Sequence, residues 1–317
     1  MLAANPTAVC PVTACPGAAA SPEPPPAPGE LHVRLAHLNA QRLCPAEPTE
    51  QWTDDLAQAH ALALLEGRFL EQERAAVADR AAQAPRQPEA FAAWFDALRD
   101  DGPGQYDGLF DYLAEQATVD QMRWFLVQEL ATEAGFDDLV ALTQLRMPTR
   151  VKLELARNYW DEMGRGKARA MHGPMLDALA QSLGVEPAPL DTVAWESLAV
   201  SNLLAGLAYN RRFAYHSLGA LGAIELTAPS RAVKVVEALE RLGIEKIAAR
   251  YFRLHAVVDI GHARTWRDEV LIPTVTANPQ AAVHIAEGAL MRLVAGARTF
   301  DHYRAHMGVP HPVRPTA

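Results

Sequence analysis

One short segment, HAVVDIGH at residues 255–262, constrains most strongly how this chain can fold. At 100° per residue, His255, Asp259 and His262 lie at roughly 0°, 40° and −20° around a helix, so they share one face. The surrounding residues, YFRLHAVVDIGHA, are largely apolar, so this face is expected to point into a core built by other helices. Two imidazoles and a carboxylate suit iron or manganese. The alternative is a polar helix face on which these side chains only form hydrogen bonds.

The rest of the chain also has helical rather than strand periodicity. Leu and Ala dominate, and aromatic residues make up only 7% of the chain, a balance that favours helices. Thr118 and Gln121 have the spacing of an N-terminal capping box. We therefore expect an all-α fold with about seven core helices after an N-terminal helical arm. The expected helices cover residues 51–64, 66–84, 88–99, 107–117, 118–135, 148–184, 193–226, 230–243, 245–270 and 279–305, with a break at Ala228-Pro229.

Composition divides the chain into three expected parts. Residues 1–48 are expected to be a disordered Ala/Pro-rich tail, residues 49–104 the N-terminal helical arm, and residues 105–308 the metal-binding helical domain. The tail contains all three cysteines (Cys10, Cys15, Cys44), which argues strongly against a buried cysteine nucleophile. The N-terminus has no basic start followed by an apolar run, so a cytoplasmic protein is expected.

The charge balance limits the partners of this chain. A net charge of −9 and a pI near 5.7 disfavour a nucleic acid or an anionic membrane, because both attract a basic surface. No apolar stretch approaches the roughly 18–20 residues that span a bilayer. We expect a small-molecule substrate, with an external reductant and a homodimer as further candidates.

Glu225 is a further candidate metal ligand. It is the only Lys, Arg, Asp or Glu between Arg212 and Arg231, within the apolar segment LGALGAIELTAP. A lone buried carboxylate is unfavourable unless it is paired or bound to a metal ion. The alternative is an exposed residue at a helix end close to Pro229.

Glu162 and His172 complete the candidate set but raise a geometric problem. On a straight helix, residues ten apart are separated by about 15 Å and −80°, which is too far for both to bind in one metal site, even one that holds two metal ions about 3.5–4 Å apart. Gly164 and Gly166 lie between the two residues and would permit a kink. Without one, Glu162 or His172 is misassigned, and Glu162 could equally lie on a solvated face.

The order of these residues resembles that in the heme-oxygenase-like diiron oxidase and oxygenase family, whose members are often described as iron-containing redox enzymes. The pattern is E-x9-H, then E, then H-x3-D-x2-H, and the resemblance covers roughly residues 105–305. It implies a heme-oxygenase-like bundle and six metal ligands, with Glu129 as a possible extra one. The implied ligands are Glu162, His172, Glu225, His255, Asp259 and His262.

The resemblance also implies a function. Two Fe(II) ions would react with O2 and oxidise a small amino-acid-like or fatty-acid-like substrate by N-oxygenation, desaturation or C–C cleavage, in specialised-metabolite biosynthesis. No catalytic residue beyond the metal ligands is expected. Arg231, Arg250 and Arg264 are candidates for binding a substrate carboxylate.

Several alternatives stay open at this point. The same fold could serve a cofactor-independent oxidase, or a thiaminase-like hydrolase, although the hydrolase requires a core cysteine. A heme-binding enzyme would leave most of the candidate ligands unexplained. A non-enzymatic helical scaffold would use the polar stripe of residues 255–262 as an interface.

Overall fold

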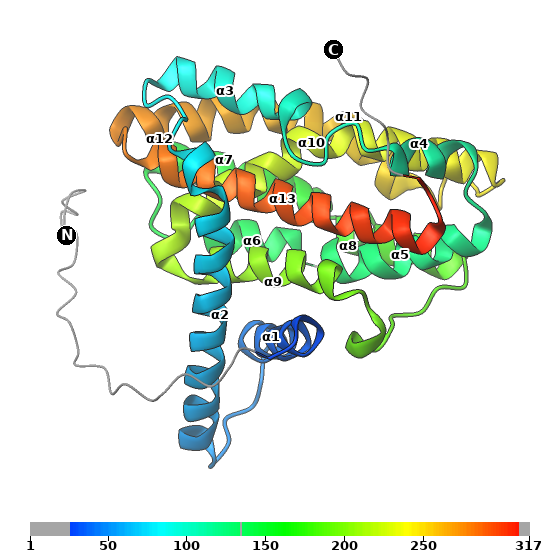
Figure 1. Cartoon of the computed structure of the whole chain (residues 1–317), viewed down its shortest axis with the longest axis horizontal. Helices are drawn as coiled ribbons and strands as arrows, with labels where there is room; N and C mark the ends of the chain where they lie inside the picture. Colours follow the sequence, from blue (N-terminus) through cyan, green and yellow to red (C-terminus); the bar gives the residue numbers. More distant parts are fainter. Residues whose placement is uncertain (1–25, 134, 311–317) are drawn as a thin grey trace.

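A computed structural model describes residues 26–310 except residue 134, and every regular element in this part of the chain is helical (Figure 1). The expected all-α fold is therefore confirmed. The α-helices are α1 (Pro28–Leu43), α2 (Trp52–Ala81), α3 (Pro88–Asp101), α4 (Gly108–Glu115), α5 (Val119–Glu133), α6 (Phe136–Thr143), α7 (Thr149–Glu162), α8 (His172–Ser182), α9 (Trp195–Tyr209), α10 (Ala214–Arg241), α11 (Arg250–Thr265), α12 (Ile272–Ala277) and α13 (Ala281–Met307).

Helices α10 and α13 pack along each other at the centre of the bundle, and α11 packs along α10. The buried apolar side chains form two clusters. The first cluster joins α2, α3, α9 and α12 to the N-terminal parts of α10 and α13. The second joins α4, α5, α8 and α11 to the C-terminal parts of the same two helices. The two central helices therefore connect both halves of the core.

The two central helices approach each other closely enough for their backbones to touch. A Cβ atom on Gly219 of α10 would lie 1.9 Å from the carbonyl oxygen of Ile285, and one on Gly288 of α13 would lie 1.9 Å from that of His216. Any side chain larger than hydrogen at either position would separate the helices. These glycines therefore fix the crossing of α10 and α13.

The N-terminal part differs from the sequence-based expectation. Residues 28–43 form α1, so the disordered tail expected over 1–48 is too long, while Cys10 and Cys15 lie outside the described residues. Helix α1 packs against α9, and α2 runs across the bundle as one helix where two were expected (Figure 1). Burial of an apolar face explains both differences. Leu35 and Leu38 of α1 lie in the first core cluster, and so do Leu62 and Phe69, which flank the break expected in α2.

The expected helix 193–226 is also wrong. Helix α9 ends at Tyr209, and a short 3-10 turn that begins at Arg211 separates it from α10. The Arg211 side chain donates hydrogen bonds to the Leu142 and Thr143 carbonyls at the end of α6. Conversely, α10 continues through Pro229 to Arg241, so the expected break at Pro229 is absent. Proline removes one hydrogen bond to the Glu225 carbonyl, but the packing of a long buried helix outweighs that loss.

The capping box and the helix expected over 245–270 agree more closely with the structure. The capping box is present. The backbone N–H of Gln121 donates to Thr118 Oγ1 over 3.3 Å, and the backbone N–H of Thr118 donates to Gln121 Oε1 over 2.9 Å. Of the expected helix 245–270, residues 245–249 are not helical, Arg250–Thr265 form α11, and Trp266–Leu271 form a π-helical turn that leads into α12. None of the helices in the described part of the chain combines the length and hydropathy needed to cross a bilayer.

Candidate metal centre

The kink required between Glu162 and His172 is present. Helix α7 ends at Glu162, α8 begins at His172, and the nine residues between them form two tight turns. Gly164, Arg165 and Gly166 have φ values of 60°, 52° and 78°, the left-handed region that favours glycine. The chain folds back so closely that a Cβ atom on Gly164 would lie 2.3 Å from the Ala170 carbonyl carbon. As a result, Glu162 Oε2 lies 2.5 Å from His172 Nδ1, whereas a straight helix would separate the two residues by nearly three turns.

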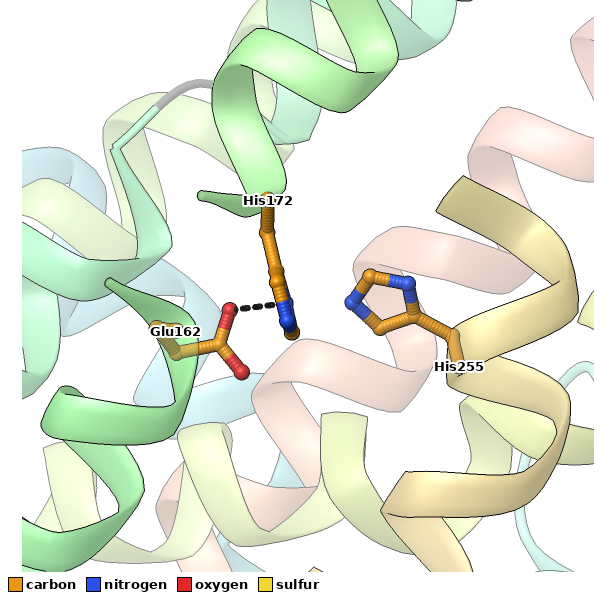
Figure 2. Close-up of side chains that lie close together, drawn as sticks. All are labelled: Glu162, His172 and His255. Carbon is orange, nitrogen blue, oxygen red and sulfur yellow. Dashed lines mark ion pairs between the residues drawn. The ribbon is translucent and has the colours of Figure 1, made fainter. Parts of the chain in front are cut away.

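Glu162, His172 and His255 form a first group of ligand-type side chains. They extend from three different helices toward one another (Figure 2), and one ligand atom of each lies within 4.8 Å of the others. His255 Nδ1 lies 2.8 Å from the carbonyl oxygen of Tyr251. This contact places the imidazole proton on Nδ1 and the lone pair on Nε2, as in many histidines that bind metal ions.

Glu162 also belongs to a second group, with Glu225 of α10 and His262 of α11, and its ligand atoms again lie within 4.8 Å of one another. His262 Nδ1 lies 3.3 Å from Glu225 Oε2 and 3.7 Å from Asp259 Oδ1. The structure therefore brings all six candidate ligands together. Five of them form two groups that share Glu162, and Asp259 lies beside the second group.

The chemistry of these donors fits divalent metal ions. Glu162, Glu225 and Asp259 are each only 2–4% exposed, and burying three carboxylates is unfavourable without nearby cations. The Nδ1 atoms of His172 and His262 lie 2.5 and 3.3 Å from carboxylate oxygens. Imidazole nitrogens and carboxylate oxygens that converge in this way are a donor set suited to a cation, either a proton or a metal ion.

The two histidines that face these carboxylates differ in their protonation. Burial alone would lower the pKa of His262, but Glu225, Glu162 and Asp161 outweigh it and raise that pKa to about 9. Burial, together with repulsion from His262, lowers the pKa of His172 to about 4. Without a metal ion, a proton on His262 therefore supplies part of the positive charge. A metal ion bound to His262 would displace that proton.

Two polar residues at the site were missed by the sequence analysis. Asn158 donates a hydrogen bond from Nδ2 to Glu225 Oε1 over 2.6 Å. Its position, four residues before Glu162 on the same helix face, was the available signal. Asp161 pairs through one carboxylate oxygen with the exposed Arg165, and its second oxygen lies 3.4 Å from His262 Nε2.

A cavity of about 270 Å³ adjoins both ligand groups. Glu129 lines it, together with every candidate ligand except His262. Its remaining wall is mostly apolar and comes from both halves of the core. The large apolar side chains of this wall include Phe110, Phe125, Leu176, Phe252 and Phe300.

Of the three arginine candidates, only Arg231 lines the cavity, where its guanidinium carbon lies 4.8 Å from the centre of the Phe300 ring. Arg250 and Arg264 are exposed and do not line it, so the structure does not support these two candidates. Helix geometry gives the reason, since Arg264 lies about 180° from His255 around α11. Arg292 of α13 also lines the cavity. The sequence analysis missed it, because nothing nearby in the sequence indicates that α13 passes the site.

The fold and the site together define an all-α bundle with a buried, carboxylate-rich group of side chains that could hold metal ions. A family model described as "Iron-containing redox enzyme" matches residues 123–297, which is more than half of the chain and includes all six candidate ligands. The chain belongs to this family of iron-containing redox enzymes, so it is an iron-dependent oxidoreductase. A comparison with curated proteins gives no significant match.

The turn between α7 and α8 leads to a prediction. Gly164→Ala should weaken Fe(II) binding by at least about 10-fold, because a Cβ atom there meets the Ala170 carbonyl and forces Glu162 and His172 apart. The measurement is the iron affinity of the purified variant, accompanied by its circular dichroism spectrum. Gly261→Ala is the matched control, since Gly261 precedes His262 directly but a Cβ atom there would have no neighbour within 4 Å. Equal iron affinities for the two variants would contradict the role assigned to this turn.

Proposed function

We propose that this protein is a non-heme diiron oxidase or oxygenase that uses O2 to oxidise a small substrate carrying a carboxylate. The observation that carries this proposal is the position of Glu162, whose carboxylate belongs to both ligand groups. A carboxylate with two oxygens can bridge two cations, which is the common arrangement in two-metal sites of helical bundles. The two iron ions would supply the electrons and the binding position with which O2 is activated.

The ligand roles follow from the two groups. Glu162, His172 and His255 would hold one iron, while Glu162, Glu225 and His262 would hold the other, with Asp259 beside it. Surrounding residues would fix these ligands. The Tyr251 carbonyl orients the imidazole of His255, and Asn158 occupies one oxygen of Glu225. Such outer contacts keep ligands in place when the metal ion or substrate changes. Glu129 lines the cavity and stays a candidate for an extra ligand.

The cavity supports a small, mainly apolar substrate with one anionic end. Its volume of about 270 Å³ is at the low end for small-molecule sites. The aromatic wall would exclude water from the reacting atoms. Arg231 and Arg292 line the same cavity and could bind a carboxylate through paired hydrogen bonds. An amino acid or a fatty acid has this combination of features, and N-oxygenation, desaturation or C–C cleavage are the oxidations we propose. An external reductant would restore the ferrous state.

The diiron proposal predicts a distinctive pattern of metal binding. In an anaerobic Fe(II) titration, the wild-type protein should bind about two irons per chain. His255→Ala and His262→Ala should each retain one tightly bound iron, because each removes a ligand from a single group. Glu162→Ala should weaken the binding of both irons, because its carboxylate belongs to both ligand groups. His302→Ala is the control, since His302 is on α13, pairs with Glu196 and belongs to none of the ligand groups found in the described residues. One iron in the wild-type protein, or a Glu162 variant that keeps both, would contradict a shared carboxylate.

The assignment of the anionic end predicts a difference between two arginines. Oxygen uptake by the iron-loaded protein should be measured with a panel of amino acids and fatty acids. For any substrate found, Arg231→Gln should raise KM by about 10–100-fold, as expected for losing a charged hydrogen bond. Arg264→Gln should leave KM unchanged, because Arg264 lies on the face of α11 opposite His255 and does not line the cavity. A normal KM for the Arg231 variant would overturn this role, and activity only on substrates without a carboxylate would overturn the substrate class.

A further inference from the structure

A third group of ligand-type side chains lies away from the candidate metal centre. It consists of His216 on α10 with His284 and Glu287 on α13, and one ligand atom of each lies within 4.8 Å of the others. His216 and Glu287 are 5% and 4% exposed, while His284 is exposed at the surface. The group therefore opens to solvent on one side only.

This group is separate from the iron site. His216 and Glu225 are both on α10, but nine residues of helix separate them by about 13 Å and half a turn. They therefore lie on opposite faces of that helix. None of the three residues lines the cavity.

The two imidazoles converge on one carboxylate oxygen. Glu287 Oε2 lies 2.8 Å from His216 Nε2 and 3.1 Å from His284 Nδ1. A tetrahedral zinc ion with bonds of about 2.0–2.1 Å holds its ligand atoms about 3.4 Å apart. For an ion to replace the protons that now lie between these atoms, the two distances to Glu287 Oε2 would have to lengthen by about 0.3–0.6 Å.

The fold holds these side chains in place before any ion binds. Gly219 and Gly288 bring the backbones of α10 and α13 into contact beside them. Arg74 of α2 approaches the other carboxylate oxygen, with its Nη1 atom 3.3 Å from Glu287 Oε1. This contact orients the carboxylate so that Oε2 faces the histidines. The positive charge of Arg74 would lower the affinity for a cation, but it also pairs with Glu71, which offsets part of that charge.

The protonation states suit a metal ion. Burial lowers the pKa of His216, which favours its neutral form. Burial alone would raise the pKa of Glu287, but hydrogen bonds from His216 and His284, together with the charges of His216 and Arg74, lower it to about 2. At neutral pH the group therefore offers a neutral imidazole and an ionised carboxylate, the forms that bind metals. His216 Nδ1 is buried without a hydrogen-bond partner.

We propose that His216, His284 and Glu287 form a second metal site, which binds a divalent ion of the zinc type between α10 and α13. Two histidines and one carboxylate are a common ligand set for zinc. The exposed side of His284 leaves room for a water molecule as the fourth ligand. An ion bound here would join the two central helices and stabilise the folded protein against unfolding.

The test is zinc binding by the full-length protein after chelation, measured by competition with a chromophoric chelator. His284→Ala should bind one fewer zinc ion per chain than the wild type, or bind that ion on the order of 100-fold more weakly. The iron stoichiometry of the same variant should be unchanged, which separates this site from the proposed diiron centre. The exposed position of His284 makes a folded variant the expected result.

His302→Ala is the matched control, because it removes a histidine from the same helix that also pairs with a glutamate. It should retain the zinc stoichiometry of the wild type. Zinc should also raise the Tm of the wild type more than that of the His284 variant. Equal zinc stoichiometry and affinity in the wild type and His284→Ala would overturn the proposal, and so would an equal loss of zinc in both variants.

Discussion

The burial of Glu162 beside two further carboxylates is the constraint on which the rest of this structure depends. Glu162, Glu225 and Asp259 come from α7, α10 and α11 and are almost fully buried. Negative charges at this density are unfavourable in an apolar interior unless cations balance them. The raised pKa of His262 is one response, because a proton there supplies a positive charge. Iron ions would balance the carboxylates more completely, and the chain belongs to a family of iron-containing redox enzymes.

The backbone around the site follows from the same constraint. Two ligands ten residues apart meet only because the chain reverses at Gly164. Helix α11 is held against α10 by Trp266, whose indole donates a hydrogen bond to the Leu218 carbonyl over 3.1 Å at the start of the π-helical turn. The site and its cavity lie where the two apolar clusters meet, so the walls come from both halves of the core. The iron and the substrate would therefore lie in one cavity enclosed by this apolar wall.

The helical class and several of the candidate ligands could be predicted from the sequence on physical grounds. The stripe of His255, Asp259 and His262 follows from helix periodicity alone, and Glu225 from its isolation in an apolar segment. The need for a bend near Gly164 followed from the distance of about 15 Å that a straight helix would place between Glu162 and His172. The sequence did not indicate that α10 would continue through Pro229, because tertiary packing outweighs local propensity there. Arg292 was missed because a contact between distant helices leaves no local pattern.

The proposed diiron centre requires Glu162 to lie between two metal ions. Anomalous diffraction at the iron edge, from crystals of the iron-loaded protein, tests this arrangement most directly. We expect two iron peaks on either side of the Glu162 carboxylate, one next to His172 and His255 and the other next to His262 and Glu225. A single peak, or iron bound without contact to Glu162, would contradict it.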